Sequence, residues 1–406
     1  MESKEERKRK LKEKLAESID YSMESSDEEI QQLIDEMLIR ESRETPMTLT
    51  ERRQLRRDLF HAIRKLDVLQ ELVDDTHITE IMINGPDCIF IERDGHLYRS
   101  ELRFESREKL QNVIQQIVAD CNRVVNEASP IVDARLQGGA RVNVVLDPVA
   151  LNGPIVTIRR FPDQPIMMED LIAYGSISAK VCEWLHKLVR AKYNIFISGG
   201  TGSGKTTFLN ALSYYIPAQE RIITIEDSAE LQIRSIPNLV RMETRNANVE
   251  GCREITIRDL IRTSLRMRPD RIIVGEVRGG EAFDMMQCLN TGHDGSMSTG
   301  HANSSGDMLS RLENMILMGM DIPLTAIRQQ IASGIDIIIH LWRLRDGSRK
   351  VLEIVEVLGY EADEIVLKPL YQFAETGTDE EGRVCGNLQK KGELSYVEKL
   401  QYAGLW

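Results

Sequence analysis

The sequence predicts an α/β protein whose largely parallel core is preceded by a smaller α+β domain and an N-terminal helical region. From residue 163 onward, short β-prone runs alternate with helical patterns, which is typical of a parallel sheet covered by helices. Between residues 74 and 162, short β-prone runs are instead separated by turn residues. A glycine-rich stretch near residue 200 joins a β-prone run to a helix. These observations predict four regions: 1–73, 74–162, 163–350 and 351–406.

The first region, residues 1–73, is predicted to be helical. Apolar residues such as Ile30, Ile34 and Leu38 recur three and four positions apart. The first twenty residues mix basic and acidic side chains almost evenly and contain no apolar stretch, which indicates a solvated helix and no secretory signal.

The second region, residues 74–162, is predicted to be a compact α+β domain. Short β-prone runs at 81–83, 88–92 and 97–99 are separated by turns such as Asn84-Gly85. A helical pattern of about 105–126 follows, and β-prone runs at 142–146 and 155–161 complete the domain. The segment 162–165, with two prolines, is predicted to be a hinge.

The third region, residues 163–350, is predicted to be the parallel core. Its β-prone runs are 193–198, 221–226, 271–275 and 296–299, and helices of about 304–319 and 323–334 follow. Ligands of such sheets bind at the carboxyl ends of the strands. A hairpin at 345–348 leads into residues 351–406, a β-rich C-terminal tail that we expect to pack on the core.

Composition narrows the class of protein. The formal net charge of −12 disfavours stable binding of nucleic acid. The six cysteines form no C-x-x-C pair, which indicates reduced thiols in a cytoplasmic protein. No apolar run approaches the roughly 20 residues that cross a bilayer.

The most specific motif is G-x-x-x-x-G-K-[ST], which lies between a β-prone run and a helix, as its chemistry requires. Backbone N–H groups of such a loop and the helix N-terminus cradle phosphates, the lysine reaches the β- and γ-phosphates, and the hydroxyl after it binds Mg²⁺. The predicted nucleotide-binding residues are Gly199, Gly200, Thr201, Gly202, Ser203, Gly204, Lys205, Thr206 and Thr207. Lys205 is then the phosphate lysine, and Thr206 is the expected Mg²⁺ ligand.

Carboxylates follow two predicted strands of the core. Glu226 and Asp227 end one β-prone run, and Glu230 follows three residues later. Glu276 ends another, where Gly275 stands at the place of the usual Mg²⁺-binding aspartate. Because these strand ends meet at the phosphate-binding edge, we expect the carboxylates to orient water and metal there.

Two histidines occur in the glycine-rich block 291–303. Their separation does not match a metal site on a helix, so His293 and His301 are predicted to sense the γ-phosphate or to couple hydrolysis to motion. Arginines can also stabilise a γ-phosphate during transfer. The candidates are Arg266 and Arg278 in the core and Arg141, Arg159 and Arg160 in the α+β domain.

The order of these blocks resembles that of the ATPases of type II and type IV secretion systems, in which they are called Walker A, Asp box, Walker B and His box. The missing Walker B aspartate is normal in that superfamily. Segments 78–86, 138–143 and 153–161 further resemble the CpaF/TadA branch, which powers Flp-type (tight-adherence) pili. The absence of a four-cysteine zinc module argues against the classical type II branch.

The resemblance implies a hexamer of two-domain subunits with a RecA-like P-loop ATPase core, which uses ATP with Mg²⁺. It makes Glu230 the general base, with Glu226 and Glu276 supporting water and Mg²⁺. Arg266 of a neighbouring subunit, and Arg141, Arg159 and Arg160 of the α+β domain, would touch phosphates. The expected partner is an inner-membrane platform protein, which would hold the hexamer peripherally at the cytoplasmic face.

Other functions stay open on the sequence alone. A conjugation-type ATPase that moves DNA or protein shares all these motifs. A nucleotide-gated scaffold with little turnover is a second alternative, although Lys205, Glu230 and Glu276 favour an enzyme. A helicase or a P-loop kinase is disfavoured by the acidic balance and by the lack of an acceptor-binding lid, respectively. The cargo and the direction of movement do not follow from the sequence.

Overall fold

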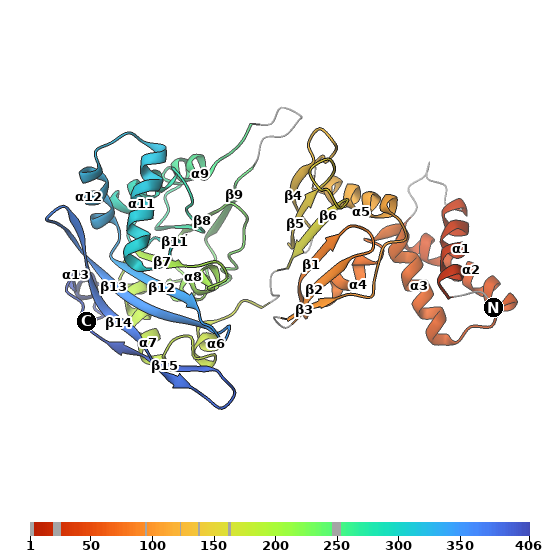
Figure 1. Ribbon diagram of the computed structural model, residues 1–406. Helices are drawn as coiled ribbons and strands as arrows, with labels where there is room; N and C mark the ends of the chain where they lie inside the picture. Colours follow the sequence, from red (N-terminus) through yellow and green to blue (C-terminus); the bar gives the residue numbers. More distant parts are fainter. Residues whose placement is uncertain are drawn as a thin grey trace. The chain divides into compact units, whose positions relative to one another are not determined.

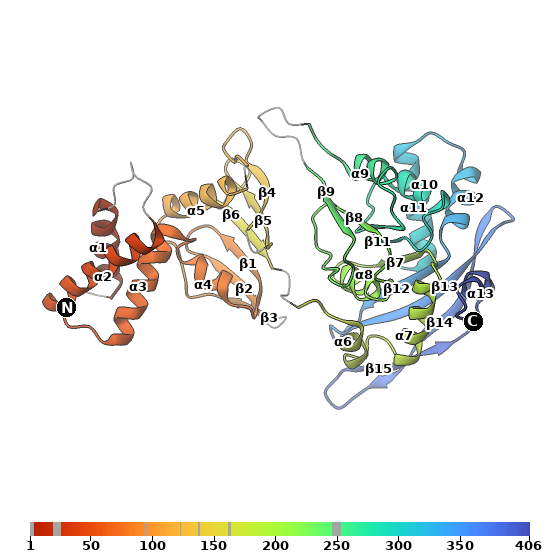
Figure 2. The same cartoon turned by 180° about the vertical axis from the view of Figure 1, so that it is seen from behind.

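The computed structural model describes residues 4–18, 26–93, 96–121, 123–136, 139–160, 164–245 and 253–406. The chain divides into two compact units, Met1–Asp163 and Gln164–Trp406 (Figure 1 and Figure 2). The predicted hinge starts at residues 162 and 163, which lie outside the described residues. Within the described ranges, no helix is long and apolar enough to cross a membrane.

The first unit begins with helices α1 (Lys4–Ser18), α2 (Asp27–Glu44), α3 (Leu49–Arg64) and α4 (Leu69–Asp74). Capping boxes start α2 and α3, because the Ser26 and Thr48 hydroxyls accept from the backbone N–H three residues later. The apolar faces of α1, α2 and α3 bury one small cluster: Leu11, Leu15, Ile30, Ile34, Leu38 and Leu59.

An antiparallel sheet and helix α5 (Arg107–Ala119) form the rest of the first unit. The described strands run in the order β3-β2-β1-β6-β5-β4. Helix α5 places Leu110 and Ile114 in one buried cluster with Ile81, Val142 and Ile158 of the sheet, which completes an α+β fold. The strand bounds are Ile78–Asn84 (β1), Ile89–Arg93 (β2), His96–Arg99 (β3), Ile131–Arg135 (β4), Arg141–Val145 (β5) and Ile155–Arg159 (β6).

The second unit is built on a single large sheet, whose described strands run in the order β15-β14-β13-β12-β7-β11-β10-β8-β9. From β12 to β9 neighbouring strands are parallel, and from β12 to β15 they are antiparallel. The strand bounds are Ile195–Gly199 (β7), Ile222–Glu226 (β8), Leu239–Glu243 (β9), Arg271–Val274 (β10), Met297–His301 (β11), Ile337–Arg343 (β12), Arg349–Glu361 (β13), Glu364–Thr378 (β14) and Val384–Lys390 (β15).

Helices cover both faces of this sheet, as alternate residues of β7 make clear. Ile195 and Ile197 lie in one buried cluster with Leu185 of α7 and Leu209 of α8. Phe196 points the other way, into the cluster formed with α9, α10, α11 and α12. The helix bounds are Met168–Ala173 (α6), Ala179–Arg190 (α7), Lys205–Ser213 (α8), Ile257–Ser264 (α9), Ala282–Asn290 (α10), Ser305–Gly319 (α11), Leu324–Gly334 (α12) and Glu398–Tyr402 (α13).

The C-terminal residues continue the sheet of the core. The segment expected as a β-rich tail supplies β13, β14 and β15, which extend the sheet from β12 (Figure 1). Strand β12 is the first arm of the predicted hairpin, and it also joins the parallel core beside β7. Strands β4 and β9 correspond to no predicted run.

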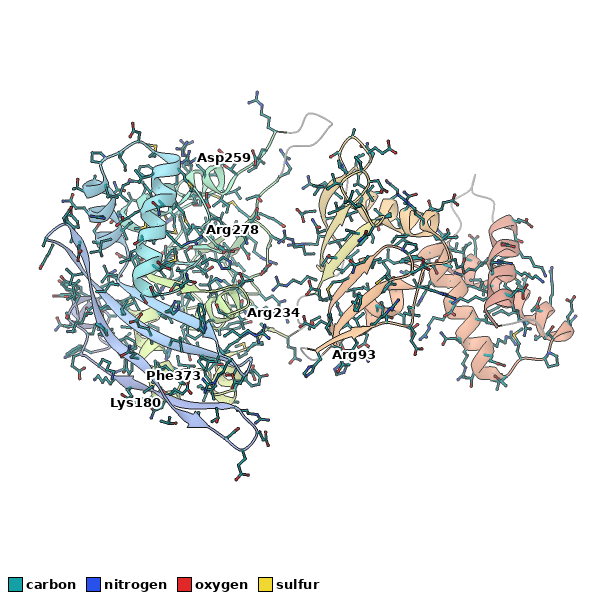
Figure 3. All side chains as sticks on the ribbon, viewed as in Figure 1. Arg93, Lys180, Arg234, Asp259, Arg278 and Phe373 are labelled. Carbon is teal, nitrogen blue, oxygen red and sulfur yellow. The ribbon has the colours of Figure 1, made fainter. Side chains whose placement is uncertain are left out.

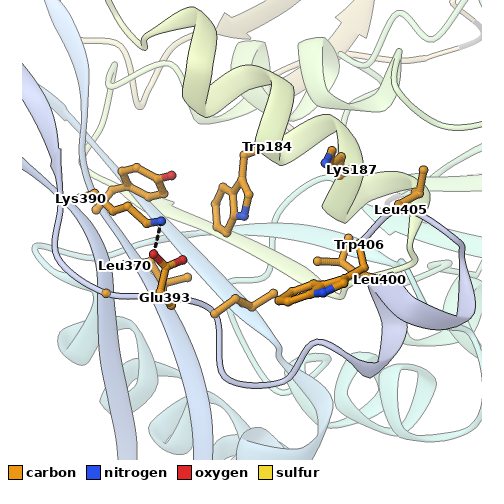
Figure 4. Close-up of a pocket in the computed structure, with 11 residues that line it drawn as sticks. Trp184, Lys187, Leu370, Lys390, Glu393, Leu400, Leu405 and Trp406 are labelled. Carbon is orange, nitrogen blue, oxygen red and sulfur yellow. Dashed lines mark hydrogen bonds and ion pairs between the residues drawn. The ribbon is translucent and has the colours of Figure 1, made fainter.

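Figure 4 shows a pocket of about 280 Å³ formed by residues of α7, β14, β15 and the chain end. The Trp184 and Tyr371 rings pack there at an interplanar angle of 56° with centroids 5.3 Å apart, and Trp406 lines the same pocket. Lys390 in its wall is already paired with Glu393. Because the lining is mainly apolar and aromatic, this pocket does not suit a triphosphate.

A buried ion pair fastens the amino end of β10. Arg271 is fully buried, and its guanidinium donates two hydrogen bonds to the Glu220 carboxylate and others to the carbonyls of Val189 and Gly295. Removing one partner of such a pair leaves an uncompensated buried charge, which is far more costly than losing an exposed pair.

We expect Glu220→Ala to lower the free energy of unfolding by about 3–5 kcal/mol, because it strands the Arg271 charge. All three tryptophans lie in the second unit, so urea unfolding followed by tryptophan fluorescence reports on this unit. The control is Glu381→Ala, which removes an exposed carboxylate paired with Arg383 and should leave stability unchanged. Equal effects of the two substitutions would contradict this account of the buried pair.

Candidate active site

The glycine-rich loop leaves β7 at Gly199 and enters α8 at Lys205. Gly202 and Gly204 adopt the left-handed φ angles of 69° and 91°, which a side chain would strain. A Cβ at Gly199 would lie 2.4 Å from the Leu341 carbonyl oxygen and 2.5 Å from Ser203 Oγ, so only glycine fits there. The loop thus has the compact backbone that a phosphate cradle needs.

Lys205 is held inside this loop. Its side chain is almost fully buried, and its ammonium donates to the Gly200 carbonyl at 2.9 Å and lies 3.3 Å from His301 Nδ1. Burial lowers the pKa of Lys205, whereas the nearby Glu276 carboxylate acts in the opposite direction. A triphosphate would replace these neutral partners with negative charge.

Glu276 and His301 continue the chain of contacts from Lys205. His301 Nε2 lies 2.8 Å from Glu276 Oε1, and Arg278 donates to Glu276 Oε2 at 2.7 Å. Burial, and then the Lys205 charge, lower the pKa of His301, which favours a neutral imidazole that can accept from Lys205. The Arg278 side chain, labelled in Figure 3, also comes within 3.8 Å of Asp227. Five side chains therefore meet at the carboxyl ends of the parallel strands: Lys205, His301, Glu276, Arg278 and Asp227.

Glu226 orders the segment that carries Glu230. It is the last residue of β8 and 3% exposed, and its Oε2 accepts from the backbone N–H groups of Glu230 at 2.7 Å and Leu231 at 2.9 Å. Burial raises the pKa of Glu226 to about 7, although the two N–H donors oppose that shift. A Cβ at Gly275 would lie 2.9 Å from Glu226 Cγ. Glu226 therefore fills the space where an aspartate at position 275 would start.

The donor set fits a magnesium-bound triphosphate. Among the described residues, three buried oxygens have no hydrogen-bond partner: Ser203 Oγ, Glu226 Oε1 and Glu276 Oε1. The 2.8 Å approach of His301 Nε2 to Glu276 Oε1 therefore lacks hydrogen-bond geometry. Buried oxygens without donors are costly, and a hydrated Mg²⁺ supplies donors. Thr206, in the first turn of α8, stands where the motif predicts the metal ligand.

Two predicted site residues lie away from the carboxyl ends of the strands. His293 precedes the first residue of β11, whereas His301 ends that strand, and five strand residues span about 16 Å. Arg266 follows α9 and precedes the start of β10, so it also lies towards the amino ends of the strands, and its side chain is exposed. The structure brings neither residue to the phosphate loop of this chain.

The predicted arginines of the first unit have local surroundings of their own. Arg141 on β5 is the cross-strand partner of Arg159 on β6, and Arg141 also lies 3.5 Å from the Asp133 carboxylate. Arg160 donates to the backbone carbonyl of Asp75. Arg159 is the exposed member of the three.

Sequence reasoning missed the contacts that the β12–β13 hairpin makes with the loop. Arg349 donates to the Gly202 carbonyl at 2.8 Å, and His340 Nδ1 lies 2.9 Å from Ser198 Oγ. These residues are more than 140 positions from the loop in sequence, and no local motif marks them.

Fold and site together define a P-loop protein with a RecA-like core and an N-terminal α+β domain. The family described as Type II/IV secretion system protein matches residues 63–402, and the chain belongs to this family, within the superfamily of type II/IV secretion ATPases. The resemblance on which the superfamily was predicted is thereby confirmed.

Relatives with similar sequences carry names from conjugation and type IV secretion. A putative conjugal transfer protein of Mycobacterium tuberculosis is 36% identical over 293 residues, which cover 71% of this chain and 83% of the relative. The type IV secretion system protein VirB11 of Bartonella henselae is 33% identical over 334 residues, which cover 72% and 92%.

Solved structures share the fold. The Legionella pneumophila ATPase DotB is 20% identical with a TM-score of 0.52, over 71% of this chain and 79% of that one. The pilus retraction motor PilT, solved with ADP, is 17% identical with a TM-score of 0.50, over 84% and 86%. At these identities the likeness concerns the fold alone.

The raised pKa of Glu226 makes stability depend on pH. Between the ordinary value of 4.5 and about 7, the folded protein binds a proton that the unfolded chain releases. The contribution of Glu226 therefore decreases as pH rises through this window. Glu226→Gln needs no proton at this position. We therefore expect its free energy of unfolding, relative to that of the wild type, to increase by roughly 2–3 kcal/mol from pH 5 to pH 8. Urea unfolding followed by tryptophan fluorescence at both pH values measures the gain. The exposed substitution Glu380→Gln is the control, and a change with pH that is equal in the two variants would contradict the assignment.

Proposed function

We propose that this chain hydrolyses ATP to ADP and phosphate and works as a hexameric motor that powers assembly of a Flp-type or type IV-like pilus, or secretion across the inner membrane. One observation carries the ATPase proposal: the phosphate-loop residue Lys205 and the carboxylate of Glu276 are joined through His301 at one edge of the sheet. A lysine, a carboxylate and a phosphate loop so arranged are the parts that phosphoryl transfer requires.

The loop and Lys205 bind the triphosphate in this mechanism. Backbone N–H groups of residues 199–207 and the N-terminus of α8 surround the phosphates. Lys205 exchanges the Gly200 carbonyl for β- and γ-phosphate oxygens, which are stronger partners because they are charged. Thr206, together with the phosphates, would hold Mg²⁺, and the bound ion would supply positive charge next to the phosphates. Glu276 orients water beside them.

Glu230 is the proposed general base. Its backbone N–H is fixed by Glu226, and its side chain is only partly buried, so its carboxylate can accept a proton from an attacking water. Glu226 instead positions the segment of Glu230, because its pKa is raised to about 7 and one of its oxygens is bound to backbone donors. We propose that three further residues sense whether the γ-phosphate is present and pass this on to the carboxyl ends of the neighbouring strands: Arg278, His301 and Asp227.

A ring of subunits accounts for the residues that one subunit does not bring to the loop. Arg266 is exposed and lies towards the amino ends of the strands, so we propose that it acts on the nucleotide of a neighbouring subunit. Arg141, Arg159 and Arg160 of the α+β domain are proposed to complete the phosphate contacts. His293 is proposed to couple movement between subunits.

We propose an inner-membrane platform protein as the partner, with the hexamer bound peripherally at the cytoplasmic face. The net charge of −12 is a reason to expect no stable binding of nucleic acid. The names of the relatives favour a second candidate, a conjugation-type ATPase. A strain lacking the gene, scored both for surface filaments and for transfer of DNA or protein, separates the two. If the chain is instead a scaffold, the purified protein should hydrolyse almost no ATP.

Mixing inactive variants tests hydrolysis and the ring together. Lys205→Ala should abolish nucleotide binding, and Arg266→Ala should lower turnover by at least about 10³-fold if it supplies the arginine in trans. Mixed in equal amounts, the two variants should recover about a quarter of wild-type activity, because one site in four pairs an intact Lys205 with an intact neighbouring Arg266.

The control mixes Lys205→Ala with Glu276→Gln. Both residues belong to the site of one subunit, so every mixed site lacks one of them and activity should not return. An inactive mixture of Lys205→Ala with Arg266→Ala would refute the trans arginine. A wild type that hydrolyses no ATP under any condition of assembly would refute the motor and leave the scaffold.

A further inference from the structure

The β12–β13 hairpin runs directly past the phosphate loop. Leu341 of β12 pairs in parallel register with Gly199, the first residue of the loop. A Cβ at Gly200 would lie 3.4 Å from the Trp342 ring, so the hairpin also packs on the next residue. The loop therefore has a second neighbour, on the side of β7 away from β11.

Arg349, the first residue of β13, reaches the loop from this hairpin. Its Nε donates to the Gly202 carbonyl at 2.8 Å, and its Cδ would lie 3.4 Å from a Cβ at Gly204. A guanidinium has five N–H donors. In the described part of the chain, only the Nε contact is made, so the terminal amino groups remain available beside the loop.

The charge around Arg349 is uncompensated. Its cross-strand partner on β12 is Arg343, and like charges directly opposite each other destabilise a sheet. Arg345, in the same hairpin, differs: its guanidinium binds the Glu375 carboxylate through two hydrogen bonds. Within the described ranges, Arg343 and Arg349 have no carboxylate partner. The free donors of Arg349 beside a phosphate loop favour an anion as their partner.

The hairpin turn is fixed in place, so these arginines are presented by a rigid element. The Asp346 carboxylate accepts from the backbone N–H of Ser348 at 3.0 Å and from that of Val384 at 2.7 Å. Burial alone would raise the pKa of Asp346, but these donors and the Ser348 hydroxyl lower it to about 2. Preorganised donors bind an anion with little cost in conformational entropy.

We propose that Arg349, with Arg343 beside it, contacts the phosphate chain of the nucleotide bound in its own subunit. The inference rests on the proposed function, because it assumes that the loop binds a nucleotide. In the order β12-β7-β11-β10, Arg349 approaches from β12, whereas His301 and Glu276 approach from β11 and β10. Arg349 thus flanks the loop on the side opposite the groups placed for the γ-phosphate. Arg349 should therefore strengthen the binding of ADP and the binding of ATP by the same factor.

Binding measurements on Arg349 variants test this contact. Dissociation constants for MgADP, a non-hydrolysable MgATP analogue and inorganic pyrophosphate would be measured by competition with fluorescent ADP. Arg349→Ala should weaken all three by about tenfold or more, since it removes a charge-assisted contact. Arg349→Lys should recover part of the loss. Arg345→Ala, which changes the paired arginine of the same hairpin, should match wild type, and melting temperatures without ligand should be equal for all variants.

Each outcome decides the assignment. Unchanged affinity in Arg349→Ala would overturn it, and so would weaker binding of ADP with unchanged binding of pyrophosphate, which would indicate contact with the nucleoside. A loss that follows a lower melting temperature and that lysine does not rescue would make Arg349 a structural support of Gly202 only. If the wild type binds no nucleotide, the proposed function fails and takes this inference with it.

Discussion

The site depends on the way β7 leaves the sheet. At Gly199 the chain passes so close to the Leu341 carbonyl of β12 and to Ser203 that a Cβ would collide with both. This close approach lets two parallel neighbours end beside the same loop: β11 delivers His301 on one side, and β12 delivers the hairpin of Arg349 on the other. A side chain at position 199 would separate the strands whose ends form the site.

Burial decides which charges can act. Burial lowers the pKa of both Lys205 and His301. The buried Lys205 ammonium therefore gains by exchanging its neutral partners, one of them His301, for phosphate oxygens. Glu226 and Gly275 fit together, because the buried side chain of Glu226, at its Cγ, occupies the space left by the absent side chain of Gly275. The absence of a Walker B aspartate therefore has a steric reason in this chain.

Local patterns predicted the parts of the site that follow directly from a strand end. Glu226 and Glu276 each end or follow a short apolar strand, His301 ends a short strand of small residues, and the P-loop has a spacing of its own. Strands β4 and β9 were missed because each is the last strand at one end of its sheet and only Ala134 among their residues is buried, so they carry no long apolar run. Arg349 is 147 residues from its partner Gly202, and only the strand order brings them together.

His293 and His301 share one motif but lie at opposite ends of β11, and this difference gives the most direct test. Histidines labelled with ¹³C at Cε1 would be followed by NMR as MgADP is added, with His293→Asn and His301→Asn variants to assign the signals. The account predicts that the His301 signal moves as Lys205 turns to the phosphates, and that it moves further than the His293 signal, because only His301 contacts Lys205. Movement of His293 with a stationary His301 would contradict the placement of the nucleotide at this loop.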